Sequence, residues 1–455
     1  MSTPTMGADD AGDGVVNNTG RRATPYRAVW RWHFYAGLFS APVLVILAIT
    51  GALYLFDHEI DGWLHRDLQR VEVAGTPATL ADQEAAVLAA HPGASVRNAL
   101  LPRAPDQATR FGITRADGSE AQVFVDPYTR TVRGLVDPGW SLMNIVRDLH
   151  GNLLTGEIGS HLVELTACWT LVMLATGLYL WWPRNWRRGA FVPRAGATGR
   201  AFWRDWHAIP SMFNALLVLF LVLTGLPWSA FWGTQFAKLG AQLPLIAPSP
   251  NFTSGPPASI TGLPWTIQHH GTPQGSAVPQ ARIGHVEGSL ARLDTATHGP
   301  GVKVSYPAQP GGVFLVSFVP ARAQGQRTLY LDPADGRVLG DISWRDYSPT
   351  AKAIEWGVMT HMGRQYGLIN QLIGVFVCLT LVGTVVAGIV LLWKRRPTGR
   401  LAAPEVKAGD RLPRFLLVTL VTMGVLFPLL GATLAVVALV DRYAARLSGR
   451  GQPAA

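Results

Sequence analysis

Two histidines of this sequence stand at the same distance from a Thr-Gly pair. The interval from His33 to Gly51 equals the interval from His207 to Gly225. This interval makes about five turns of α-helix, so each histidine shares a helical face with its glycine. A histidine inside an apolar run is costly in a membrane and indicates a bundle interior or a bound group.

A second pair of histidines repeats a longer spacing. The interval from His150 to Gly177 equals the interval from His361 to Gly388. The chain therefore contains an internal duplication, in which a membrane span, an outer segment and a second span occur twice. Both copies start on the same side, so a pseudo-two-fold axis along the membrane normal should bring equivalent histidines face to face.

Opposed imidazoles supply both axial ligands of a low-spin haem iron. We therefore expect two b-type haems, one held by His33 and His207 near the cytoplasmic side and one by His150 and His361 near the outer side. Neither Cys168 nor Cys378 lies in a Cys-x-x-Cys-His motif, so covalent haem is not indicated. The other expected contacts are Gly51 and Gly225 beside the outer haem, Arg31 and Arg204 at the inner propionates, Arg147 and Arg364 at the outer propionates, and His161 as an alternative outer ligand.

Each of these assignments has a plainer alternative. A single histidine at the end of a span is more often interfacial than a ligand, and only the duplicated spacing favours haem. The Thr-Gly pairs could be close helix packing, and the arginines could be topology anchors. His161 and Glu164 could form a proton path or simply a polar pair at the interface.

Composition places these histidines in a membrane protein. Apolar residues make up 48% of the 455 residues and charged residues only 15%, which is low for a soluble chain of this length. Basic residues concentrate in short segments that should be cytoplasmic, and the longer segments between spans should be periplasmic.

The expected order is a disordered cytoplasmic tail (1–28), a membrane helix (29–56), a periplasmic domain (57–149), a histidine turn and helix (150–182), a cytoplasmic linker (183–206), a helix (207–232), a second periplasmic domain (233–360), a histidine turn and helix (361–393), a linker (394–412), a fifth helix (413–440) and a tail (441–455).

The fifth helix fits less well than the other four. It contains Pro428, and it would place Arg442, Arg446 and Arg450 outside, against the positive-inside trend. The two outer segments each end in an Asp-Pro motif between short apolar stretches, at Asp126 and Asp332. This pattern predicts a β-hairpin in an α+β module for each segment, with a helix near 79–92 in the first.

These features resemble the PepSY-associated transmembrane proteins, which include iron-regulated inner-membrane proteins and ferric-siderophore reductases of bacteria. The resemblance rests on the Trp-His pairs at His33 and His207, the Thr-Gly pairs, the Phe56–Asp61 exit, the GLYLWWPR sequence at 177–184 and the two Asp-Pro hairpins. It covers about 27 to 396. It implies a multi-span helical protein with two PepSY-like domains and bis-histidine haem at His33, His207, His150 and His361.

The expected function is electron transfer across the bacterial inner membrane to a periplasmic acceptor. The resemblance favours a ferric siderophore or another ferric chelate, reduced from Fe³⁺ to Fe²⁺, with Glu59, Asp61, Trp228 and Trp232 flanking the acceptor. No nucleotide-binding fingerprint occurs, so quinol or a cytoplasmic reductant should be the donor, and nothing indicates nucleic acid. The alternatives are a PepSY-type binding or regulatory protein without haem, and an iron or siderophore permease.

Overall fold

The computed structural model describes residues 25–182, 189–242, 265–267, 271–292, 301–395 and 411–450. Most of the expected tail 1–28, part of each expected linker, part of the second outer segment and the end of the tail 441–455 lie outside these ranges. The chain forms two compact units, one of residues 1–34 and 403–455 and the other of residues 35–402. Each unit is described by itself.

Within the part of the chain that the structure describes, four helices are long and apolar enough to cross a membrane, which confirms a multi-pass membrane protein. They are α1 (Pro25–Tyr54), α6 (Glu157–Trp181), α7 (Gly199–Gly225) and α12 (Leu368–Arg395). Helix α7 begins at Gly199, inside the segment expected to be a linker. Its first two turns are amphipathic rather than apolar, so hydropathy alone did not mark its start.

The two outer histidines lie on short helices that precede the second and fourth spans. His150 lies on α5 (Leu142–Asn152) and His361 ends α11 (Pro349–His361). The chain then turns through Gly156 and Gly367, whose φ angles are +65° and +60°. Only glycine adopts this conformation without strain, so the equal spacing of each histidine and its glycine reflects one repeated turn.

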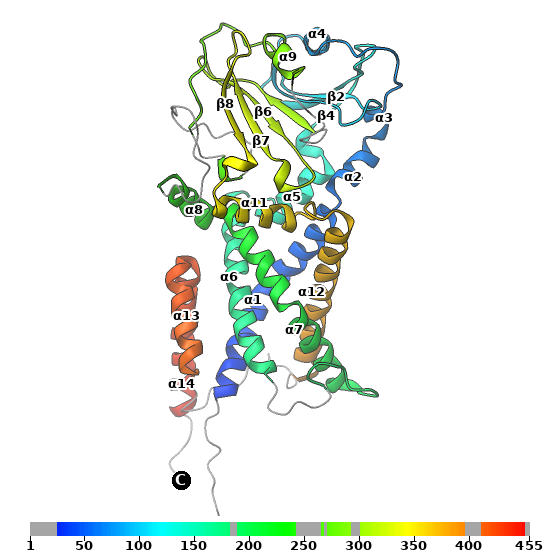
Figure 1. The fold of residues 1–455 in the computed structure, drawn as a ribbon. Helices are drawn as coiled ribbons and strands as arrows, with labels where there is room; N and C mark the ends of the chain where they lie inside the picture. Colours follow the sequence, from blue (N-terminus) through cyan, green and yellow to red (C-terminus); the bar gives the residue numbers. More distant parts are fainter. Residues whose placement is uncertain are drawn as a thin grey trace, which may run out of the picture. The chain divides into compact units, whose positions relative to one another are not determined.

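The two outer segments together form one continuous antiparallel sheet (Figure 1). The strand order is β4-β3-β2-β1-β5-β6-β7-β8, so each copy supplies four strands and β1 pairs with β5 at the centre. The order is symmetric about that central pair, as a duplication predicts. The strands are β1 (Ser95–Leu100), β2 (Thr109–Thr114), β3 (Glu120–Val125), β4 (Val132–Val136), β5 (Val302–Ser305), β6 (Phe314–Phe318), β7 (Arg327–Leu331) and β8 (Val338–Ser343).

Both predicted hairpins are confirmed, as β3–β4 and β7–β8. The carboxylate of Asp126 accepts a hydrogen bond from the Tyr128 amide at 2.9 Å, and Asp332 accepts one from the Ala334 amide at 2.9 Å. An aspartate that bonds to the backbone two residues on fixes a tight turn. The same residue type therefore makes the same turn in both copies.

One face of the sheet carries the main hydrophobic core. Val87 on α4 (Leu80–Ala90) and Val286 on α9 (Gly284–Leu290) pack there against strand residues such as Phe111 and Phe314. Helix α4 confirms the helix expected near 79–92, and Thr79 caps it by accepting a hydrogen bond from the Asp82 amide. The opposite face of the first four strands is more polar and faces the chain segment that leads into α5.

Short helices connect these parts. They are α2 (Asp57–Leu64), α3 (Arg66–Gln69), α8 (Ala230–Gln242) and the 3₁₀ turns η1 (Pro138–Trp140), η2 (Leu226–Trp228), η3 (Trp265–Ile267), η4 (Ala323–Gly325) and η5 (Trp344–Asp346).

The expected fifth helix over 413–440 is two helices in the structure, α13 (Arg414–Leu426) and α14 (Pro428–Arg450). A Cβ added at Gly424 would lie 3.2 Å from the Cα of Gly431, which is possible only if the two helices fold back on each other. Pro428 lacks an N–H and ends the first helix. This segment is a helical hairpin, and its α13 arm is only 13 residues long.

Candidate functional site

His150 is held by a threonine of the neighbouring helix α1. The Nδ1 atom of His150 lies 3.0 Å from the hydroxyl of Thr50, and that hydroxyl donates its own proton to the carbonyl of Ile46 at 2.7 Å. A threonine has one hydroxyl proton, so with that proton on the Ile46 carbonyl we assign His150 Nδ1–H as the donor to Thr50. This tautomer leaves the lone pair on Nε2, the nitrogen available to a metal.

His361 has the same environment in the second copy. Its Nδ1 lies 2.9 Å from the hydroxyl of Thr224, which donates to the carbonyl of Phe220 at 2.7 Å. Each ring also has a hydrogen bond to the backbone, of Leu47 for His150 and of Leu221 for His361, and among the described residues no side chain is bonded to either Nε2. Each outer histidine is therefore oriented at one nitrogen and available at the other.

The glycines of the two Thr-Gly pairs make room for these imidazoles. A Cβ at Gly51 would lie 3.2 Å from Cε1 of His150, and one at Gly225 would lie 3.4 Å from Cε1 of His361. Gly51 and Gly225 were expected beside a haem, where the missing side chain would admit a macrocycle. In the structure, the space left by the missing side chain is filled by the histidine ring itself. We call each Thr-Gly pair a histidine seat, because the threonine bonds to the ring and the glycine leaves room for it.

Burial keeps both outer imidazoles neutral. Desolvation lowers the pKa of His150, and it lowers the pKa of His361 to about 4, with a smaller contribution from nearby His150. His150 thus lies close enough to act electrostatically on His361. A neutral imidazole is the form that binds a metal.

His207 is held in a related way by α12. Its Nδ1 lies 2.9 Å from the carbonyl oxygen of Thr384, and a Cβ at Gly388 would lie 3.3 Å from its Cε1. A backbone carbonyl accepts only, so Nδ1 of His207 carries the proton. His33 belongs to the other compact unit, and the pairing of His33 with His207 stays a prediction.

His161 lacks such a seat. Its Nδ1 bonds to the carbonyl of Glu157 one turn earlier on the same helix, at 2.8 Å. Glu164 is buried, and its carboxylate accepts hydrogen bonds from the Phe231 and Trp232 amides at 2.8 and 3.3 Å. Glu164 therefore caps the amino end of α8. This structural role was not predicted from the sequence, where His161 and Glu164 were treated as one pair.

All four arginines expected at haem propionates have carboxylate partners of their own, and Arg31, Arg204 and Arg147 are described first. Arg31 is buried and binds Asp441 through two hydrogen bonds of 2.7 and 2.9 Å within its own unit. Arg204 lies 3.2 Å from its neighbour Asp205, and Arg147 lies 3.2 Å from its neighbour Asp148. Arg204 and Arg147 are both more than half exposed, so these contacts do not fix their side chains.

Arg364 differs from the other three. Its Nη2 pairs with Asp57 at 2.8 Å, while its Nε is buried with no hydrogen-bond partner in the part of the chain described. Burial lowers the pKa of the nearby Arg103, and the charge of Arg364 lowers it further. Two neighbouring guanidinium groups beside one carboxylate favour an additional anion at this place. Sequence reasoning missed Arg103, because nothing in its local pattern places it near Arg364.

The four residues expected to flank an acceptor have different contacts in the structure, and Glu59 and Asp61 share helix α2. Asp61 accepts hydrogen bonds from Arg110 and His65 and lines a cavity below the sheet. Glu59 accepts a hydrogen bond from Gln371 at 3.0 Å. Trp228 is exposed in η2, and the Trp232 amide is one of those capped by Glu164.

The chain belongs to a known family. The model of the PepSY-associated TM region matches residues 30–396, which confirms the family that the sequence motifs indicated. No curated protein matches the chain. Family membership includes both copies of the duplicated unit and therefore all four histidines.

Proposed function

We propose that this protein carries electrons across the bacterial inner membrane to an acceptor on the side of the sheet. Two b-type haems would be held without cysteine, one by His33 and His207 and the other by His150 and His361. Bound haem iron would supply one-electron chemistry by cycling between Fe³⁺ and Fe²⁺.

One observation supports this proposal above all others. His150 and His361 come from different copies of the duplicated unit, and the Nδ1 of each contacts a threonine hydroxyl that donates to its own helix, which supports the tautomer with Nδ1 protonated and Nε2 available. A histidine that is buried only for packing does not need one ring nitrogen bonded to a fixed acceptor and the other left available. Metal-binding histidines characteristically donate their second ring N–H to a neighbouring acceptor, which fixes the tautomer.

The chain's own residues have distinct tasks in this proposal. Thr50 and Thr224 orient the imidazoles, and the helix-borne glycines let the rings lie close to α1 and α7. Arg364, with its buried and unsatisfied Nε, would bind a propionate of the outer group, and Arg103 lies close enough to assist. His150 is preferred to His161 because only His150 has a Thr-Gly seat.

We further propose a ferric chelate of the siderophore class as the acceptor. The support is membership of the PepSY-associated TM family, together with a folded domain at one end of the helices (Figure 1). Hard oxygen ligands hold Fe²⁺ less firmly than Fe³⁺, so reduction would release the iron. The donor would be quinol or a cytoplasmic reductant, with the amino terminus inside and both large segments in the periplasm.

Dithionite-reduced protein mixed with a panel of ferric chelates tests the acceptor. Reoxidation of the protein with formation of Fe²⁺, trapped by ferrozine, is the expected result for at least one hydroxamate, catecholate or carboxylate chelate. A reduced protein that no chelate of the three classes oxidises would remove this acceptor class while leaving the haem proposal intact.

A further inference from the structure

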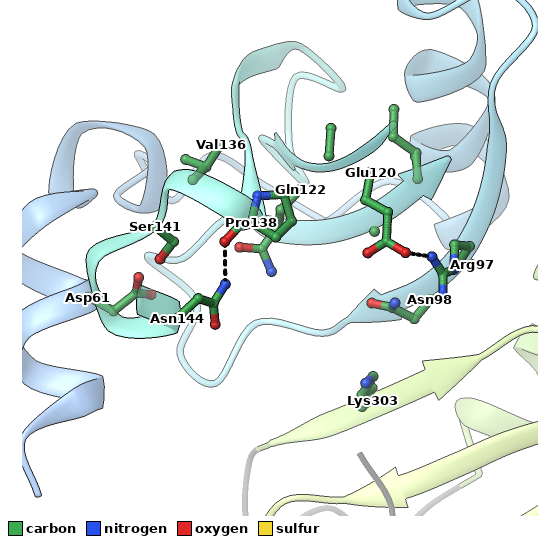
Figure 2. Close-up of a pocket in the computed structure, with 13 residues that line it drawn as sticks. Asp61, Arg97, Asn98, Glu120, Gln122, Val136, Pro138, Ser141, Asn144 and Lys303 are labelled. Carbon is green, nitrogen blue, oxygen red and sulfur yellow. Dashed lines mark hydrogen bonds and ion pairs between the residues drawn. The ribbon is translucent and has the colours of Figure 1, made fainter. Parts of the chain in front are cut away.

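A polar cavity lies between the sheet and the segment that leads into α5 (Figure 2). Its volume is about 250 Å³, and its wall comes from α2, the strands β1 to β5, η1 and the start of α5. The lining residues used below are Asp61, Arg97, Asn98, Glu120, Gln122 and Lys303.

Lys303 is the unusual member of this wall. It lies on β5 between Val302 and Val304, which point into the hydrophobic core, so Lys303 points to the opposite face. Its ammonium group makes no hydrogen bond or ion pair with any residue that the structure describes. Burial lowers the pKa of Lys303, and the charge of Arg97 lowers it further, whereas a bound anion would favour the charged ammonium form.

The other charged side chains of the cavity already have partners. Arg97 forms an ion pair with Glu120, and both are drawn together in Figure 2. Asp61 lies 3.2 Å from Arg110 and 3.0 Å from His65. Among the lining residues, Lys303 is therefore the one charge without a counter-charge in the described chain.

Neutral polar groups surround this charge. The side chains of Asn98 and Gln122 also bond to none of the described residues and present amide donors and acceptors. Asn98 has its position because its register partner on β2 is Gly112, where a Cβ would lie 2.6 Å from the Asn98 amide nitrogen. Such groups suit a ligand with oxygen atoms beyond its charged group.

The cavity limits the size and the charge of its ligand. Pockets for drug-sized ligands have volumes of roughly 300–1,000 Å³, so a cavity of about 250 Å³ suits a smaller molecule. The carboxylates of Asp61 and Glu120 line the same space and oppose a second negative charge on the ligand.

We propose that this cavity binds a small organic monocarboxylate, with the carboxylate beside the Lys303 ammonium and the rest of the molecule among the amides. The site is independent of the haem proposal, since none of its residues is a proposed haem ligand.

Calorimetric titration of the full-length protein in detergent, with L-lactate as the probe, tests this site. We expect saturable binding in the millimolar range, little binding of neutral lactamide, and weaker binding of malate, which has a second carboxylate. Lys303→Met should weaken lactate binding by about tenfold or more, because a hydrogen bond to a charged group is lost. Lys303→Arg should retain binding, and Lys352→Met, at a half-buried lysine of α11 that does not line the cavity, should match the wild type.

Glu120→Gln provides a second arm that does not depend on the folding of the Lys303 variants, since Glu120 is largely exposed. It removes a like charge from the cavity, so malate should bind more tightly than to the wild type. Absence of saturable lactate binding to the wild type would overturn the proposal, as would lactate binding that Lys303→Met leaves unchanged.

Discussion

A hydroxyl, rather than a carboxylate, sets the tautomer of the outer histidines. Thr50 and Thr224 each donate their single proton to a carbonyl of their own helix, so each can only accept from the imidazole. A neutral acceptor fixes the ring without adding a negative charge beside it. This arrangement orients the ligand without the gain in basicity that a carboxylate acceptor would give it.

Replacement of this acceptor should weaken the outer site. We expect Thr50→Val and Thr224→Val each to lower haem affinity by about tenfold, in the range observed when the acceptor behind a metal-binding histidine is removed. Haem retention on dilution and the reduction potential of the outer haem measure the effect. Thr419→Val is the matched control, because Thr419 makes the same bond to its own helix and none to a histidine of the described chain. Equal retention and potential in the control and the Thr224 variant would contradict the assigned role.

Filling the glycine seat should displace the ring. A Cβ at Gly51 would lie only 3.2 Å from His150, so Gly51→Val should push the imidazole away and lower the haem content from about two per chain toward one. Gly383→Val is the control, since a Cβ at Gly383 meets no atom within 4 Å. Haem content is measured on the purified protein by pyridine haemochrome absorbance. A full complement in Gly51→Val would show that the seat is not required.

At this scale the sequence identified the repeated histidines and Thr-Gly pairs but not the contacts between them. His150, His361 and the Thr-Gly pairs were evident from the duplicated spacing, whereas the contact between each histidine and its Thr-Gly pair depends on how separate helices cross. The buried ion pair of Arg31 with Asp441 is likewise long-range, so local sequence suggested a propionate partner instead.

At the scale of elements, duplication made the local structure predictable. Both Asp-Pro hairpins, the helix α4 and the four membrane helices follow from periodicity and turn residues. The merger of the two outer segments into one sheet was not predictable, because the alternating pattern of β1 and β5 identifies a strand without identifying its neighbour.

The carboxylate of Glu164 should act on helix α8. Glu164→Gln should speed hydrogen exchange of the Phe231 and Trp232 amides and cost about 1 kcal/mol of local stability, because a charged cap at a helix amino terminus is lost. Glu157→Gln, at an exposed glutamate on the same helix as Glu164, should leave these amides unchanged. Unchanged amide exchange with an altered pH dependence of haem reduction would instead assign Glu164 to a proton path.

The α13–α14 hairpin should not cross the membrane. Its α13 arm extends about 20 Å, less than the ~30 Å hydrocarbon core. The chain turns back at Phe427, and the pair of Arg31 with Asp441 joins α14 to the start of α1 within one unit. A hairpin returns the basic tail to the side from which the segment starts, which restores the positive-inside trend that a single fifth span breaks.

Reporter fusions test this topology. A reporter after Ala455 should behave like one placed in the expected cytoplasmic linker at Ala402, and unlike one inserted at exposed Gly75 in the first outer segment. Alkaline phosphatase and green fluorescent protein give opposite signals on the two sides. A carboxyl-terminal fusion that behaves like the Gly75 insertion would show that the segment spans the bilayer.

At the scale of the whole molecule, the duplication is the feature that relates sequence, structure and proposed function. Each copy provides one histidine near the start of its first span and one before its second span, together with four strands of the common sheet. Under the proposed function, this repetition would supply two equivalent histidine pairs without any Cys-x-x-Cys-His motif. The binding or regulatory alternative gives no reason for His150 and His361 to have the same threonine contact and the same neighbouring glycine in both copies. The permease alternative requires a polar path, whereas Glu164, a buried acidic residue of α6, is occupied in capping α8.

The most direct test is the visible spectrum and haem content of the full-length protein purified from haem-sufficient cells. The proposal predicts about two b-type haems per chain, with a sharp Soret band and resolved α and β bands after dithionite reduction. It also predicts that His207→Ala and His361→Ala each remove one haem and that the double variant removes both. A well-folded but colourless wild-type protein, or a full haem content in both single variants, would contradict it.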